Sequence, residues 1–111
     1  MAEYLIICKT KGMATSLLYR MVDYIVACYV DPDIKVNKRE GVIVATGLNA
    51  RIRFVTEAKE DEARRGFTGI IVSGYALDKF LDPWEVARCR EALKKEGTDD
   101  RALIRYEEAV K

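Results

Sequence analysis

The apolar positions of this chain follow two different spacings, which divide it into strands and helices. Short apolar runs and alternations predict strands at residues 3–9, 34–38, 42–46, 51–56 and 69–72, the last as a second core strand. Apolar residues spaced by three and four predict a long helix over 14–30, with Thr15 or Ser16 as its N-cap. Further helices are predicted at 57–65, 82–96 and 98–110, and residues 75–81 are interpreted as a loop or one helical turn.

The order of these elements predicts the fold class. The three strands between residues 34 and 56 are separated only by short turns, so we expect an antiparallel hairpin of two or three strands. Combined with the strand–helix opening, this order predicts an α/β fold with a mixed sheet and helices packed on it. A length of 111 residues favours a single domain over 1–111, with a sheet-containing core at 1–81 and a C-terminal helical pair at 82–111.

Composition removes several kinds of chemistry. The chain has no histidine, which excludes Ser-His-Asp and Cys-His catalysis within it. Its three cysteines, Cys8, Cys28 and Cys89, form no CxxC pair, and we expect no metal or cofactor. Cys8 and Cys28 lie in apolar runs and are interpreted as buried reduced thiols, which suits the cytoplasm.

The charge pattern gives little direct information about a partner. The formal net charge of +1 predicts no global attraction to nucleic acid or to a membrane. The longest apolar-rich stretch, residues 17–30, contains Arg20 and Asp23 and is too short to span a bilayer. The acidic start at Glu3 does not fit a signal peptide, so a cytoplasmic location is expected.

One long segment resembles a known family. Residues 51–78 contain Ile52-x-Phe54, the turn Arg65-Gly66 and the apolar strand Ile70-Ile71-Val72. This order resembles the core of P-loop ATPases, in particular phage terminase large subunits and related helicase-like motors, over Glu3 to Asp78. The resemblance implies a P-loop-like core and a phage or mobile-element origin, with the host cytoplasm as the location.

The residues that would perform P-loop chemistry are missing from this segment. When Thr15 is placed at the Ser/Thr position of the phosphate loop, Ala14 falls where the lysine belongs. Met13 and Cys8 then replace the two glycines, and Ser73-Gly74 replaces the magnesium-binding and catalytic acids. Without those groups the charge on a transferred phosphoryl group has no counterweight, so the core is expected to be degenerate and not an enzyme.

Several cationic residues are candidates for anion or nucleic-acid binding. The predicted hairpin carries five basic residues: Lys35, Lys38, Arg39, Arg51 and Arg53. They are interpreted either as a surface that binds phosphates or an acidic partner, or as the solvated face of a sheet. Lys9 and Lys11 follow the first strand, where they indicate either a residual anion site or a solvated turn. Arg64 and Arg65 are interpreted as ligand contacts or as charges that complement a helix C-terminus.

Other residues suggest interfaces or small sites. Trp84 is interpreted as a core residue or an interface anchor, and Tyr75 and Tyr106 are further interface candidates. Ser73-Gly74-Tyr75 indicates either a small site or a structural turn. The acidic cluster at residues 57–62 is interpreted as a solvated helix face and not as a metal site, because neighbouring helical positions diverge.

Three functional hypotheses follow from these observations. The leading one is a non-enzymatic interaction module that binds a protein partner or self-associates, with a counter-defence role if the family resemblance holds. The second is a nucleic-acid binder that uses the basic hairpin. The third is a regulator that binds a small molecule or nucleotide through Lys9, Lys11 and Thr15.

Overall fold

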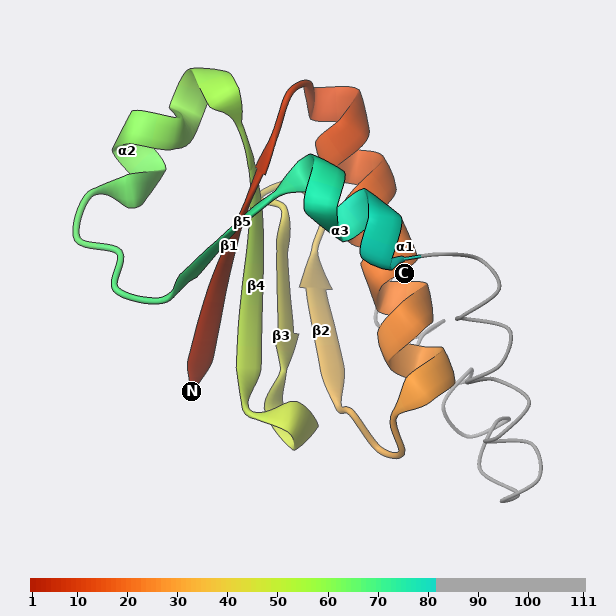
Figure 1. The fold of residues 1–111 in the computed structure, drawn as a ribbon. Coiled ribbons are helices and arrows are strands. Elements are labelled where there is room, and N and C mark those ends of the chain that lie inside the picture. Colours follow the sequence, from red (N-terminus) through yellow and green to blue (C-terminus); the bar gives the residue numbers. More distant parts are fainter. Residues whose placement is uncertain (82–111) are drawn as a thin grey trace.

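Residues 1–81 are the part of the chain that the computed structural model describes, and their strands form one five-stranded sheet (Figure 1). The strand order is β2-β3-β4-β1-β5. The strands are β1 (Ala2–Cys8), β2 (Ile34–Asn37), β3 (Val42–Ala45), β4 (Ala50–Thr56) and β5 (Ile70–Ser73). The helices are α1 (Lys11–Cys28), α2 (Glu60–Arg64) and α3 (Gly74–Phe80), with 3-10 turns η1 (Thr46–Leu48) and η2 (Glu57–Lys59).

The sheet is mixed. β2, β3 and β4 pair antiparallel as a three-stranded unit, with Ile43 opposite Val36 on one side and Ile52 on the other. β1 pairs parallel with both β4 and β5, and places Ile6 between Phe54 and Val72. The predicted α/β fold with an antiparallel hairpin in a mixed sheet and helices packed on it is therefore confirmed.

The two faces of the sheet are covered unequally. α1 and α3 lie on one face, where they cover the larger core (Figure 1). That core contains Leu17, Val22 and Ile25 of α1 packed over Ile43 and Phe54 of the sheet. On the other face α2 covers a smaller cluster in which Ala63 packs with Leu5 and Val55. Consecutive strand residues point to opposite faces, so the alternation in the sequence separates the two clusters.

α1 begins earlier than the sequence predicted. Its N-cap is Thr10, whose hydroxyl accepts a hydrogen bond from the Met13 backbone N–H at 3.1 Å. The prediction of Thr15 or Ser16 as the cap is wrong, because both lie inside the helix that Thr10 starts. The extended backbone of Thr10 lets the chain turn into the helix directly after β1, so only Lys9 and Thr10 connect the two elements.

β5 is an edge strand, which corrects its prediction as a second core strand. Within residues 1–81 it pairs only with β1, and it lies at the end of the strand order. Ile70 is 55% exposed and Ile71 is 38% exposed, although both belong to an uninterrupted apolar run. An apolar run indicates a strand, but its burial depends on which elements cover it, and here the cover is incomplete.

α3 replaces the loop or single turn that was expected at residues 75–81. The Ser73 hydroxyl caps it by accepting a hydrogen bond from the Ala76 N–H at 3.1 Å. Gly74 allows it to start against β1, because a Cβ there would lie 2.9 Å from Met13 Cε and 3.1 Å from Ile7 O. Leu77 and Leu81, four residues apart, are both buried in the larger core. The helices predicted at 82–96 and 98–110, with Trp84 and Tyr106, lie outside the described residues.

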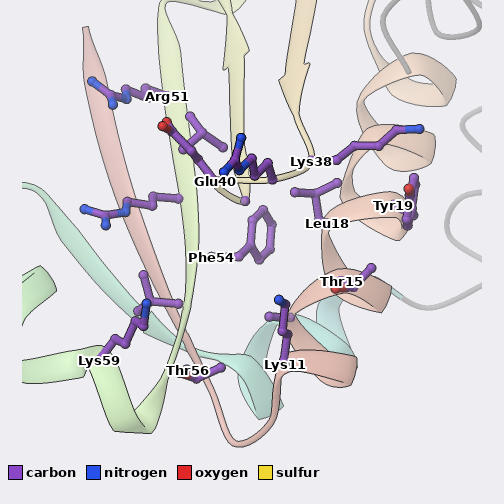
Figure 2. A pocket seen from close by; sticks show the side chains of 16 residues that line it. Lys11, Thr15, Leu18, Tyr19, Lys38, Glu40, Arg51, Phe54, Thr56 and Lys59 are labelled. Atoms are coloured by element: carbon purple, nitrogen blue, oxygen red, sulfur yellow. The ribbon is translucent and has the colours of Figure 1, made fainter. Parts of the chain in front are cut away.

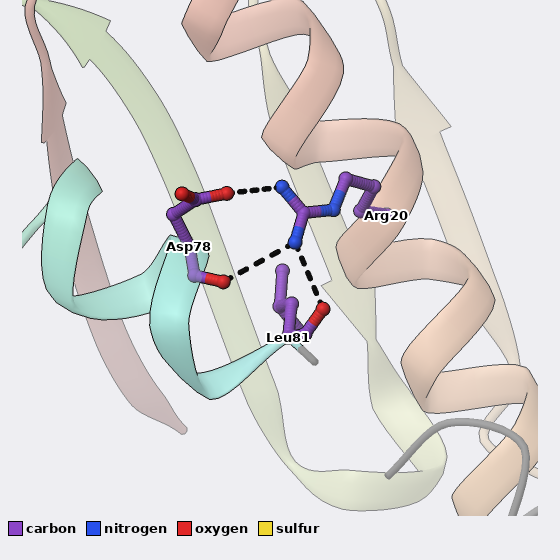
Figure 3. A network of polar contacts seen from close by, with 3 residues as sticks. All are labelled: Arg20, Asp78 and Leu81. Atoms are coloured by element: carbon purple, nitrogen blue, oxygen red, sulfur yellow. Dashed lines mark hydrogen bonds and ion pairs between the residues drawn. The ribbon is translucent and has the colours of Figure 1, made fainter. Parts of the chain in front are cut away.

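Arg20 ties the C-terminal end of α3 to α1 (Figure 3). Its Nη1 forms an ion pair with Asp78 Oδ1. Its Nη2 donates to Leu81 O at 2.8 Å and to Asp78 O at 3.2 Å. The last carbonyls of a helix have no partner within the helix, so the guanidinium satisfies two groups that would otherwise depend on water.

We expect Arg20→Ala to destabilise the domain by about 1 kcal/mol, because two carbonyls lose a charged donor at a partly exposed site. Asp78→Asn should have a smaller effect, since it leaves both hydrogen bonds to carbonyls in place. Urea unfolding of the two variants measures the difference. An equal loss in both variants would assign the effect to the ion pair instead of the carbonyl contacts.

Candidate functional site

A groove of about 620 Å³ lies beside the first residue of β3, where β4 continues past its neighbour. The pairing of β3 with β4 starts at Val42 opposite Arg53, whereas β4 remains paired with β1 as far as Thr56. The end of β4 therefore projects past its neighbour, and the groove occupies the resulting step between β4, the β2–β3 turn and the start of α1. We call this feature the basic groove, because most of its charged lining residues are cationic.

The lining of the basic groove is strongly cationic. In the described part of the chain its charged residues are one acid, Glu40, and six bases: Lys11, Lys38, Arg39, Arg51, Arg53 and Lys59. They come from α1, the β2–β3 turn, β4 and η2, which are distant in the sequence. The fold thus concentrates positive charge that the net charge of +1 does not reveal.

The cations lie on both sides of β4. Figure 2 shows Lys11, Thr15, Tyr19 and Lys38 on the α1 side of the strand, and Arg51 and Lys59 on the other. Arg51 and Arg53 alternate with the buried Ile52 and Phe54, so their side chains leave the sheet on the face away from α1. A long anion that follows the basic groove can therefore meet positive charge over more than one face.

Most of this charge is not compensated within residues 1–81. Arg51 Nη1 lies 3.9 Å from a carboxylate oxygen of Glu3 on the neighbouring strand β1, which is a weak pair between half-exposed side chains. The other five bases form no ion pair with any described residue. Lys38 Nζ lies 5.8 Å from the centre of the Tyr19 ring, a cation–π contact that does not neutralise the ammonium group. The basic groove is thus available to an external anion.

The β2–β3 turn sets the position of Lys38, Arg39 and Glu40. Asn37 closes the turn by accepting hydrogen bonds from Glu40 N at 3.0 Å and Gly41 N at 2.9 Å. Gly41 has a φ of +70°, and a Cβ there would lie 2.9 Å from Phe54 O. Only glycine fits this position without strain, so the turn approaches the β4 backbone closely and brings its charged residues to the basic groove.

The remaining cationic candidates lie elsewhere. Lys9 follows β1 and Lys35 lies on β2; both are exposed, and neither lines the basic groove. Arg64 Nε donates to Glu60 Oε2 at 2.7 Å within α2. Arg64 and Arg65 end that helix, which is the arrangement that complements its dipole, and Gly66 follows with a φ of +69°. The structure therefore brings together Lys11, Lys38, Arg39, Arg51 and Arg53 from the predicted set.

Sequence reasoning missed Lys59. It lies in η2, directly after β4, and was treated only as part of a charged helix. The signal that could have found it is its position three residues beyond the end of the strand that carries Arg51 and Arg53. A 3-10 turn at that point keeps its side chain at the same end of the sheet.

A second groove, of about 540 Å³, is apolar. It lies between α1, α3 and the sheet and is lined by residues such as Tyr4, Ile6, Tyr24, Val72 and Phe80. Tyr24 and Phe80 meet edge to face with ring centroids 5.1 Å apart. Tyr75, the interface candidate within the described residues, is 56% exposed on α3 but does not line this groove. Ser73 of the Ser73-Gly74-Tyr75 segment acts as a helix cap.

The described residues provide little for metal or thiol chemistry. Within residues 1–81, no group of three or more acidic, cysteine or histidine side chains could hold a metal ion. Cys8 is buried and burial raises the pKa of its thiol, so it is a protonated packing residue. Cys28, predicted to be buried, is only half-buried. Within the same range, no helix has the length and apolar character needed to cross a bilayer.

Comparison with protein-family models, with curated proteins and with solved structures finds no match to this chain. The resemblance to P-loop motors, together with the phage origin that it implies, stays a prediction. The case for a function therefore depends on the geometry and charge of the grooves.

Proposed function

We propose that this protein is a non-enzymatic binding module that holds the phosphate backbone of a nucleic acid in the basic groove. The observation that supports this proposal is the convergence of six bases around one open groove whose lining contains a single acid among residues 1–81. Lys and Arg side chains that neutralise phosphates release counterions, and this release supplies most of the affinity of binding that is independent of base sequence. Of the three hypotheses that the sequence suggested, this function corresponds to the nucleic-acid binder.

The spread of the charges favours a polymer over a mononucleotide. The bases lie on both sides of β4, whereas one nucleotide would need its phosphate contacts on one side. The β1–α1 connection has two residues and no glycine, and the Thr10 hydroxyl is already used as a helix cap. Lys11 and Thr15 do line the basic groove together, so a nucleotide regulator is the second candidate.

The groove supports binding better than catalysis. The lining residues that the structure describes offer one carboxylate and no histidine or cysteine, so few of them could transfer a proton near neutral pH. We propose that binding takes place in the cytoplasm, in keeping with the buried, reduced thiol of Cys8.

Fluorescence anisotropy with labelled duplex DNA, single-stranded DNA and single-stranded RNA tests this function. We expect binding at low salt, with a plot of log K against log salt that has a slope of about −3 to −5 for four to six phosphate contacts. Polyglutamate, which has charge but no phosphate geometry, is the matched control ligand.

Each outcome of this experiment has a defined meaning. Binding to nucleic acid that exceeds binding to polyglutamate at equal charge supports the proposal. No binding to any of the three nucleic acids at low salt contradicts it. A thermal shift with nucleoside triphosphates, in the absence of polymer binding, would select the nucleotide regulator instead.

A further inference from the structure

The edge of the sheet formed by β5 has the features of a pairing surface. Among the strands of residues 1–81, β5 is hydrogen-bonded to β1 alone, and its four residues, Ile70 to Ser73, carry no charge. Half of the backbone N–H and C=O groups of an edge strand point away from its neighbour. Natural edge strands are usually protected by lysine, proline or a bulge, and β5 has none of these.

The opposite edge of the same sheet shows the contrast. β2 carries the exposed Lys35 and Asn37, so pairing along it would bring a charge and a polar side chain against a partner. β5 instead exposes Ile70 and Ile71, at 55% and 38%. These two side chains leave the strand on opposite faces, so a partner strand could cover both of them.

We infer that β5 pairs antiparallel with β5 of a second copy of this chain, which joins the two sheets into one. This inference is independent of the proposed nucleic-acid function. Directly opposed residues of two antiparallel strands point to the same face of the sheet, so a residue cannot face its own sequence neighbour in the second copy. The two-fold axis, perpendicular to the sheet, must therefore place one residue of β5 opposite the same residue of the second copy. With the axis at Ile71, Ile71 faces Ile71 of the second copy, and Ile70 faces Val72 of the second copy.

This register continues the apolar rows that already exist in each copy. On the α1 and α3 face Tyr4 pairs with Ile70, and Ile6 pairs with Val72. The two-fold therefore brings Tyr4 and Ile70 into one row with Val72 and Ile6 of the second copy. On the other face Leu5 pairs with Ile71, and the row becomes Leu5, Ile71, Ile71 and Leu5. Self-complementarity of both rows identifies a second copy as the occupant, since no charged or polar side chain opposes an apolar one.

Analytical ultracentrifugation over a concentration series tests the pairing. We expect the full chain to form a dimer, and Ile71→Lys to raise its dissociation constant more than tenfold, because two ammonium groups would meet on the two-fold axis. In the monomer the lysine can reach solvent, so folding should be retained. Val30→Lys is the control: Val30 is 47% exposed and follows the end of α1, away from β5.

A cross-link then tests the register. In a background with Cys28→Ser and Cys89→Ser, Ile71→Cys should form a disulfide-linked dimer on mild oxidation, since Ile71 faces itself. Ile70→Cys should form it at least tenfold more slowly, because Ile70 faces Val72. A chain that stays monomeric, as expected if the edge serves a strand of another protein, overturns the inference. So does a dimer that Ile71→Lys leaves intact, or equal cross-linking by the two cysteine variants.

Discussion

The double variant Lys38→Glu/Arg53→Glu is expected to lose nucleic-acid affinity by about 100-fold or more at low salt. Both residues line the basic groove, Lys38 from the β2–β3 turn and Arg53 from β4. Each reversal removes a phosphate contact and adds a repulsive charge at the same place. The magnitude of the slope of log K against log salt should fall by about two, one for each lost contact. Anisotropy titrations at several salt concentrations measure both quantities.

A matched control separates the local effect from net charge. Arg65→Glu/Lys79→Glu changes the net charge by the same amount, and both residues are exposed and lie outside the lining of the groove. Compared at about 0.1–0.15 M salt, this control should retain affinity within a few fold of the unmodified chain, because charges beyond the Debye length of about 8–10 Å at that ionic strength are screened. If both double variants lose affinity equally, binding depends on total charge and the basic groove is not the site. Far-UV circular dichroism confirms that all variants are folded.

Ile43→Ala is expected to lower the free energy of unfolding by about 2–4 kcal/mol, the largest stability effect we predict. Ile43 is fully buried on β3, where it pairs with Val36 and Ile52 and packs into the core beneath α1. Truncation removes apolar burial and leaves a cavity that a packed sheet cannot close. In a domain of this size the melting temperature should fall by more than about 8 °C.

Val44→Ala is the control for this prediction. Val44 is the next residue on the same strand but points to the other face, where it is only half-buried. Its truncation should cost less than about 1 kcal/mol. Thermal and urea unfolding of the two variants therefore test the register of β3 directly. A one-residue slip exchanges the two faces, so a larger loss for Val44→Ala would contradict the register described here.

Much of the secondary structure could be predicted because its signals are local. The alternation of Ile52 and Phe54 with Arg51 and Arg53 predicted both β4 and the face to which each side chain points. The start of α1 and the extent of α3 could not be predicted as well. Both helices start at a hydroxyl residue, Thr10 two residues after β1 and Ser73 at the end of β5, and each hydroxyl caps a helix only when the chain turns there.

The site was predictable only as a set of separate residues. Arg51 and Arg53 were grouped with Lys38 and Arg39 because a hairpin brings neighbouring strands together. Lys11 was assigned to a different candidate site, at the end of β1, and Lys59 to none. Lys11 and Lys59 lie beside the other bases only because β4 extends past the start of β3. The residue pattern of the two strands does not indicate how far one extends past the other.

The sequence by itself determined the α/β class, the antiparallel hairpin and the absence of histidine chemistry, because residue spacing and residue type act over a few neighbours. Only the tertiary structure decided that β1 lies between β4 and β5, that β5 is left at an edge, and that bases from four segments surround one groove. Strand order is selected by the burial of faces contributed by distant segments, and no local pattern records which strand a given strand will pair with.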